Sequence, residues 1–340
     1  MGAFFIRGVV ELVDTPDLGS GAFRVWVRVP PPRQIIVIVI LVILNMDILY
    51  IVGNFSKCDD WEFRFSLRSI DKYGKNIGRV FVCGYCPDWL SDNIIKIPYE
   101  NQPYITDGDK ARNIYKQIIY AVENSDVGIN DNGNFLISMD DHYILNEVDF
   151  GNTYPHYVKD YVKRQCRFNL PLTFESGKQS PNYQKFLCDT ARFLAKKGLT
   201  RFNFAPHRNI RVNRGVIKEL QNNGINNEIF KYKKNVEGPS LISNYEYSIK
   251  NKEVDYYFPI EIVKDFKTNN IEKIRKYIKD GGTFFSTGDF LIGSDVFNIL
   301  YNLFPEKSKY ESKLWKNMIT NKEDIELNSD SDSNSDSNSK

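Results

Sequence analysis

The stretch NFLISMDDHYIL (residues 134–145) joins an apolar run to a short polar interruption. The run leads to two acids and a histidine, Asp140, Asp141 and His142, and apolar residues resume directly afterwards. A short apolar run with this kind of boundary indicates a buried strand. The acids therefore stand at the carboxyl end of a strand, which is where open α/β sheets bind their ligands.

Strands and helices alternate on both sides of this stretch. We expect strands at residues 47–53, 79–84, 94–98 and 135–139, and helices at residues 61–73, 109–124, 182–197, 214–222, 271–279 and 294–303. Such alternation favours one mostly parallel sheet with right-handed crossovers. The sequence therefore predicts an α/β fold with a Rossmann-like, mostly parallel sheet flanked by helices, followed by a C-terminal half rich in aromatic residues, loops and helices.

The N-terminal end of the chain differs from the rest. The segment VVELVDTPDLGSGAFRVWVRVPPP (residues 9–32) resembles the translation of a transfer-RNA gene. The apolar run at residues 35–44 is shorter than the roughly 20 residues that span a bilayer, although Arg33 before it leaves a signal-anchor as the competing interpretation. A strand pattern begins at Met46, so we expect the natural start there and residues 1–45 to be a mistranslated segment outside the fold.

The other end is a tail of Ser, Asp and Asn at residues 322–340. It has too little apolar surface to bury, so we expect it to be disordered. The fold is then expected to occupy residues 46–321. We assign a nucleotide-binding half to residues 46–150 and an acceptor half to residues 151–321.

Charge and cysteine content exclude some classes of protein. The net charge of +2 falls short of the clustered basic excess of a dedicated duplex-DNA binder. Five cysteines in a chain with no convincing secretion signal favour free thiols. Cys83 and Cys86 have the spacing of half a zinc site, but no second pair accompanies them. We expect a cytoplasmic protein with no stable membrane insertion.

Two interpretations of the acidic pair follow from its residue types. Asp140 and Asp141 can hold a hard divalent cation, Mg2+ or Mn2+, that neutralises nucleotide phosphates as a Lewis acid. They can equally cap backbone N–H groups in a turn after the strand. The spacing alone does not separate a metal site from a cap.

The stretch resembles the acidic motif of GT-A glycosyltransferases, which have a Rossmann-like fold and hold a metal ion and the nucleotide ribose with a strand-terminal Asp-x-Asp. More narrowly, the chain is similar to bacterial and phage sugar transferases related to capsular polysaccharide enzymes, in which Asp-Asp-His follows the fourth strand. Further similar blocks follow in the same order at residues 66–90, 109–121, 204–220 and 284–311. The departure from Asp-x-Asp is His142 at the third position.

This resemblance implies transfer of a hexose from a nucleoside diphosphate sugar to a hydroxyl, with Mn2+ or Mg2+ as cofactor. Asp140 and Asp141 would hold the metal and the ribose, with Asp141 required for turnover, and His142 and His207 are further candidate ligands. His207 would also lie near the diphosphate, unless it is a buried histidine bound to a backbone carbonyl.

The resemblance further implies a carbohydrate acceptor, in surface polysaccharide synthesis. Two alternatives remain at this point. One is a phage glycosyltransferase that acts on modified DNA bases, and the other is a catalytically inactive scaffold that binds a nucleotide sugar.

Two arginines on the first predicted helix are candidates for binding the nucleotide sugar. Arg64 and Arg68 lie one turn apart, and a guanidinium group matches phosphate oxygens. The alternative is that both are solvated charges that pair with the nearby acids Glu62 and Asp71.

Further candidates lie elsewhere in the chain. Asp109 and Asn113 open the helix before the acidic strand, where an anion can bind, although N-capping explains Asp109 equally well. A catalytic base is not visible from spacing, and Asp289 and Asp189 are the candidates for it. We leave the stereochemistry of transfer open.

Overall fold

The structure is a computed structural model of the chain. It describes residues 45–54, 56–100, 107–151, 156–157, 160–161, 181–204, 208–233, 236–250, 256–257, 263–266, 271–287 and 290–312. The expectations for residues 1–44 and for the tail lie outside the described residues, as do His207 and Asp289.

The centre of the fold is a five-stranded sheet in the order β11-β5-β1-β3-β4. Its strands are β1 (Met46–Val52), β3 (Ile77–Gly84), β4 (Ile94–Pro98), β5 (Asn134–Met139) and β11 (Ile210–Asn213). β4, β3, β1 and β5 are parallel, and β11 runs antiparallel to β5. This confirms the predicted α/β class with a mostly parallel sheet, and it is compatible with a Rossmann-like fold.

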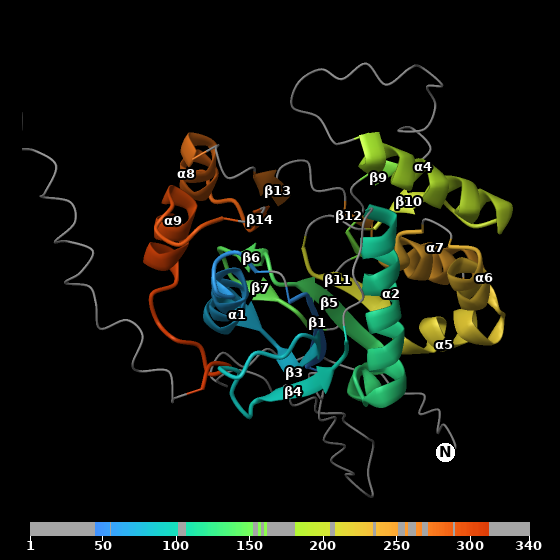
Figure 1. Ribbon diagram of the computed structural model, residues 1–340, viewed down its shortest axis with the longest axis horizontal. Helices are drawn as coiled ribbons and strands as arrows, with labels where there is room; N and C mark the ends of the chain where they lie inside the picture. The colour runs from blue at the N-terminus through green and yellow to red at the C-terminus, as the bar shows by residue number, and fades with distance from the viewer. Residues whose placement is uncertain are drawn as a thin grey trace, which may run out of the picture.

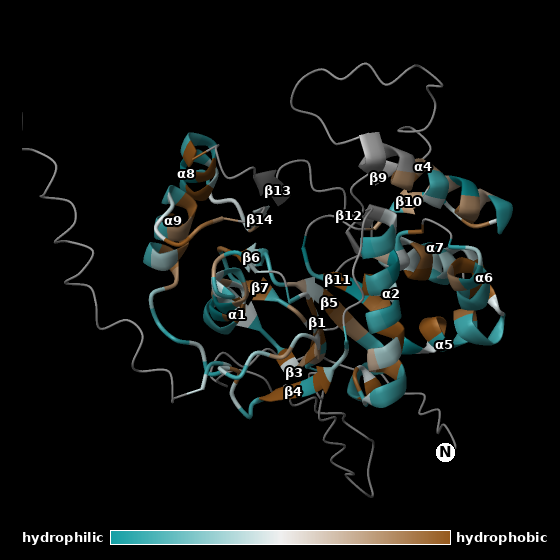
Figure 2. Cartoon of the chain, in the orientation of Figure 1, coloured by the Kyte–Doolittle hydropathy of each residue, from teal (hydrophilic) through white to brown (hydrophobic). Residues whose placement is uncertain are grey.

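Helices cover both faces of this sheet (Figure 1). One face packs against α1 (Trp61–Tyr73), and the other against α2 (Asp107–Asn124), α5 (Arg214–Asn222) and α7 (Gly238–Lys250). Outside these lie α4 (Pro181–Lys196), α6 (Ile225–Lys231), α8 (Ile271–Lys279) and α9 (Asp295–Leu303). Figure 2 shows hydrophobic residues on β1 and β3 and both colours on α2 and α8, as expected of helices with one buried face.

A second, smaller sheet lies beside the central one. It has the order β13-β14-β6, with β13 (Val263–Phe266) parallel to β14 (Phe284–Thr287) and β14 antiparallel to β6 (His142–Ile144). Short two-stranded pairs and a 3-10 turn complete the described elements: β2 (Gly74–Lys75) with β7 (Val148–Asp149), β8 (His156–Tyr157) with β12 (Tyr256–Tyr257), β9 (Asp160–Tyr161) with β10 (Phe202–Asn203), and η1 (Ile129–Asp131). None of the described helices is long and apolar enough to cross a membrane.

The helix boundaries follow the sequence pattern closely, with one instructive difference. α1, α5 and α8 have the predicted ends, but α2 begins at Asp107, two residues before the predicted start. Asp109 is therefore inside the helix, where its carboxylate pairs with Arg112. The predicted N-cap role of Asp109 is wrong, because a capping residue has non-helical backbone angles.

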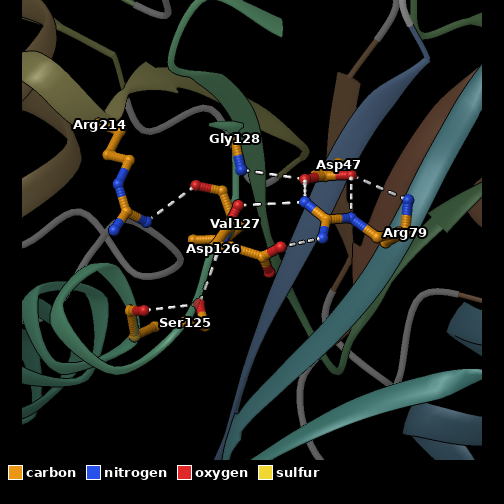
Figure 3. Close-up of polar contacts among 8 residues, drawn as sticks. Asp47, Arg79, Ser125, Asp126, Val127, Gly128 and Arg214 are labelled. Carbon is orange, nitrogen blue, oxygen red and sulfur yellow. Dashed lines mark hydrogen bonds and ion pairs between the residues drawn. The ribbon is translucent and has the colours of Figure 1, made fainter. Parts of the chain in front are cut away.

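A buried acid ties the amino-terminal edge of the central sheet together (Figure 3). Asp47 on β1 is 2% exposed and accepts hydrogen bonds from the backbone N–H and guanidinium of Arg79 on β3 and from the N–H of Gly128. Arg79 also donates to the exposed carboxylate of Asp126 at 2.5 Å and to its carbonyl at 3.0 Å. The three segments are thus joined through one carboxylate.

Asp47→Ala is expected to destabilise the fold by about 3 kcal/mol, because it leaves Arg79 and the Gly128 N–H without their buried acceptor. Asp126→Ala removes only the exposed partner of the same arginine and should cost less than about 1 kcal/mol. Urea unfolding of the two variants measures both losses. Equal losses in the free energy of unfolding would show that Asp47 does not join the three segments more strongly than Asp126 does.

A second, partly buried acid caps α7. The carboxylate of Glu237 accepts the Ser240 N–H at 2.5 Å, its carbonyl accepts the Leu241 N–H at 3.0 Å, and its own N–H donates to Thr190 Oγ1 at 3.1 Å. Burial raises the pKa of Glu237 to about 7, and the hydrogen bonds from Ser240 offset only part of that rise. Glu237 thus links α7 to α4 at the start of the helix.

The raised pKa predicts a pH-dependent stability. Between pH 4.5 and about 7 the folded protein keeps a proton on Glu237 that the unfolded chain has lost. The stability from this proton is present below pH 4.5 and lost as the pH rises through about 7. Glu237→Gln should flatten this part of the curve when unfolding is measured over a pH series, and a variant curve parallel to that of the wild type would contradict the assignment.

Candidate functional site

The carboxyl ends of the parallel strands meet at one edge of the central sheet. Val52 at the end of β1 pairs with Gly84, and its neighbour Ile51 pairs with Met139 at the end of β5. From β1, the next strands of this sheet along the chain, β3 and β4, lie on one side of β1, and β5 lies on its other side. In such sheets the binding crevice lies where the strand order reverses, which here is between the ends of β1 and β5.

The predicted acidic pair occupies this position. Asp140 and Asp141 form the turn between β5 and β6, and both are partly exposed, whereas Ser138 and His142 on either side are buried. The side chain of Asp141 is 34% exposed. Two carboxylates are thus presented to solvent from an otherwise buried piece of chain.

His142 braces this turn from inside. Its Nδ1 accepts the Met139 N–H at 3.4 Å, and its Nε2 lies 3.8 Å from Asp141 Oδ1. Because Nδ1 accepts a hydrogen bond, the neutral ring carries its hydrogen on Nε2, and a nitrogen that carries a hydrogen cannot also ligate a metal. This geometry favours a role for His142 in orienting Asp141 over the predicted role as a ligand.

Helix α1 is hydrogen-bonded to β6 and thereby holds the Asp140–Asp141 turn in place. Ser66 Oγ donates to the His142 carbonyl at 2.6 Å and lies 3.0 Å from the Tyr50 hydroxyl, which must then be the donor in that pair. One turn along, Ser69 Oγ accepts the Ile144 N–H at 3.2 Å. Burial raises the pKa of Tyr50, so its hydroxyl remains a neutral donor.

The loop after β1 brings further acids to the same edge. The left-handed backbone of Asp59 and Asp60, with φ of 52° and 60°, turns the chain into α1. Ser56 Oγ accepts the Asp60 N–H at 2.8 Å and donates a hydrogen bond to the Glu62 carboxylate. The same carboxylate accepts a hydrogen bond from the Cys58 thiol. In the sequence these acids are visible as CDDWE at residues 58–62, but they follow a loop and do not stand at the end of a strand.

Arg64 and Arg68 do not lie at this edge as solvated charges. Both are buried, and both face Glu311, with Arg68 bonded to the two carboxylate oxygens at 2.7 and 2.8 Å and Arg64 3.5 Å away. The guanidinium of Arg64 also stacks over Trp89 at 4.0 Å. Pairing with Glu62 or Asp71 as solvated charges was the wrong alternative.

These contacts also bear on the predicted phosphate-binding role of the two arginines. Burial opposes ionisation of Glu311, but Arg68 outweighs it and holds the pKa of Glu311 below its ordinary value. A phosphate that reached Arg68 would have to displace this carboxylate. The contacts therefore indicate that the arginines attach the segment around Glu311 to α1.

Arg208, a buried arginine that was not among the predicted site residues, packs on the small sheet that contains β6. Arg208 lies two residues before Ile210, the first residue of β11, which pairs with Ile137 on β5. Arg208 is 1% exposed, and its guanidinium stacks over Phe284 of β14 at 3.7 Å. Arg208 belongs to the block APHRN (residues 205–209), in which the sequence analysis names only His207 as a candidate.

The described residues limit what a metal ion could use. Among them no group of three or more His, Cys, Asp or Glu side chains is arranged to hold a metal. Asp140 and Asp141 still fit Mg2+ or Mn2+, since such ions are commonly bound by one or two carboxylates together with substrate phosphates and water. Of the other candidates, Asp109 and Asn113 lie in the first turns of α2, and Asp189 lies in α4 and pairs with Arg192 at 3.1 Å.

The cysteines of the described part of the chain are free, as expected. These are Cys58, Cys83, Cys86 and Cys188. Burial raises the pKa of Cys83 to about 12, which makes the thiol a poor metal ligand or redox group. The spacing of Cys83 and Cys86 is therefore not matched by the chemistry of a zinc or dithiol site.

Comparison with known proteins adds no family to this geometry: no protein-family model and no curated protein matches the chain.

Ser66→Ala is expected to cost about 1–3 kcal/mol, because the buried His142 carbonyl and Tyr50 hydroxyl both lose their partner. Ser91→Ala, which removes an exposed hydroxyl bonded to the Lys309 carbonyl, should change stability by less than about 0.5 kcal/mol. Chemical denaturation compares the two. If Ser66→Ala is as mild as Ser91→Ala, α1 does not fasten β6 through this hydroxyl.

Proposed function

We propose that this protein is a metal-dependent glycosyltransferase that moves a sugar from a nucleoside diphosphate sugar to a hydroxyl of a carbohydrate acceptor. The observation that carries the proposal is the position of Asp140 and Asp141. They are two partly exposed carboxylates at the carboxyl end of β5, at the point where the strand order of a mostly parallel sheet reverses.

The charge at this edge supports a metal-bound ligand over a bare anion. The start of α1 is a place where the helix dipole favours negative charge, but Asp59, Asp60 and Glu62 already occupy it. A free phosphate there would meet like charges. A divalent cation between the carboxylates and the phosphates removes that repulsion, and ribose hydroxyls can donate hydrogen bonds to the remaining acids.

Each residue of the turn has a role in this proposal. Asp140 and Asp141 would hold Mn2+ or Mg2+, which neutralises the charge that develops on the departing nucleoside diphosphate. The buried His142, whose Nε2 lies 3.8 Å from Asp141 Oδ1, would orient the Asp141 carboxylate. Ser66 keeps the whole turn fixed on α1, so the carboxylates need little rearrangement to bind.

The class of donor can be tested without knowing the acceptor. We expect the full chain to be stabilised against heat by one nucleotide among UDP-, GDP-, CMP- and dTDP-sugars, and only with Mn2+ present. At ligand concentrations of about 100 times Kd the expected gain is about 2.7 kcal/mol. No stabilisation by any member of the panel, with or without metal, would contradict the proposal.

Asp141→Asn is expected to lower metal-dependent sugar transfer or donor hydrolysis by at least about 100-fold, because it removes a charged ligand that contributes several kcal/mol in the transition state. The fold should remain, since Asp141 fills no core volume. Glu147→Gln is the matched control, because Glu147 is an exposed acid that pairs with the exposed Lys75 at 2.7 Å. Full activity of Asp141→Asn would contradict the metal assignment.

A further inference from the structure

Three polar side chains share one face of the small sheet next to the acidic turn. Ser286 on β14 pairs with His142 on β6, so their side chains point to the same side. Phe284, two residues before Ser286, lies on that side as well, and the guanidinium of Arg208 stacks on its ring. The opposite face is apolar in character, where Tyr143 packs against Phe285.

Ser286 has an unusual environment for a hydroxyl group. It is fully buried, and its Oγ has no hydrogen-bond partner within the described part of the chain. A buried hydroxyl without a partner costs stability, and alanine would fit the same space without that cost. Such a group is expected where a ligand supplies the missing partner.

Arg208 supplies the charge for such a ligand. Its guanidinium stacks on Phe284 of β14, two residues from Ser286, and Ser286 pairs with His142 next to Asp141. A guanidinium presents a planar fork of donors that fits phosphate oxygens, and stacking on Phe284 holds the plane of that fork in place.

We propose that Arg208 and Ser286 form the subsite for the diphosphate of the donor, on the small sheet that begins with β6 directly after the acidic turn. This inference rests on the proposed function for the identity of the anion. The Arg208 guanidinium and the Ser286 hydroxyl would donate hydrogen bonds to phosphate oxygens, and a metal held by Asp140 and Asp141 would supply further positive charge to the same group.

The test measures binding of inorganic pyrophosphate, and of UDP, GDP, CDP and dTDP, by calorimetry with Mn2+. Ser286→Ala is the sharpest variant, because a structural role and a ligand role predict opposite results. We expect it to melt at the same or a higher temperature than the wild type and to bind pyrophosphate about 10-fold more weakly. Arg208→Met should weaken binding by about 100-fold, and Arg208→Lys should be intermediate because it keeps the charge but not the fork.

Arg192→Met is the control, since Arg192 is 72% exposed on α4 and pairs with Asp189. If Ser286→Ala and a folded Arg208→Met both bind pyrophosphate like the wild type, the subsite is refuted. Mn2+-dependent binding of a nucleoside diphosphate by the wild type would in that case leave the proposed function standing. A wild-type protein that binds neither pyrophosphate nor any of the four nucleotides would overturn both proposals.

Discussion

The hydrogen bond from Ser66 on α1 to the carbonyl of His142 is the link on which the candidate site depends. It fixes β6 immediately after the turn, while the central sheet fixes β5 immediately before it. The two residues between these anchors, Asp140 and Asp141, therefore have defined positions although their side chains reach solvent. A rigid backbone under exposed carboxylates is what a site needs if it is to bind a charged ligand without first ordering itself.

The two edges of the central sheet have different tasks. At the amino-terminal edge an acid is buried and fully engaged, since Asp47 joins β1, β3 and the segment at Gly128. At the carboxyl edge the acids are partly exposed, and the chain there includes the left-handed residues Asp59 and Asp60. Accessible acids gather at the second edge, where α/β sheets bind ligands, and the stabilising contacts of Asp47 lie at the first.

The sequence predicted the repetitive elements well because their apolar spacing is local. The boundaries of α1, α5 and α8 follow from it directly. α7 was not predicted, since its Gly-Pro start reads as a turn and its stability comes from packing on distant helices. The same limit applies to the site. Asp140 and Asp141 are visible as a strand end, whereas the contact of Arg208 with Phe284 and the pairing of Ser286 with His142 join segments far apart in the sequence. Arg68 was misjudged because its partner, Glu311, is far away in the sequence.

In the proposed function, the Asp140–Asp141 turn holds a metal ion together with a nucleoside diphosphate. The most direct test is a crystal structure grown with Mn2+ and the nucleotide that stabilises the protein best, with anomalous scattering used to locate the manganese. We expect a manganese peak at one or both of these carboxylates, with the nucleotide bound next to it. A nucleotide bound elsewhere, or manganese with no contact to the turn, would contradict the proposed function.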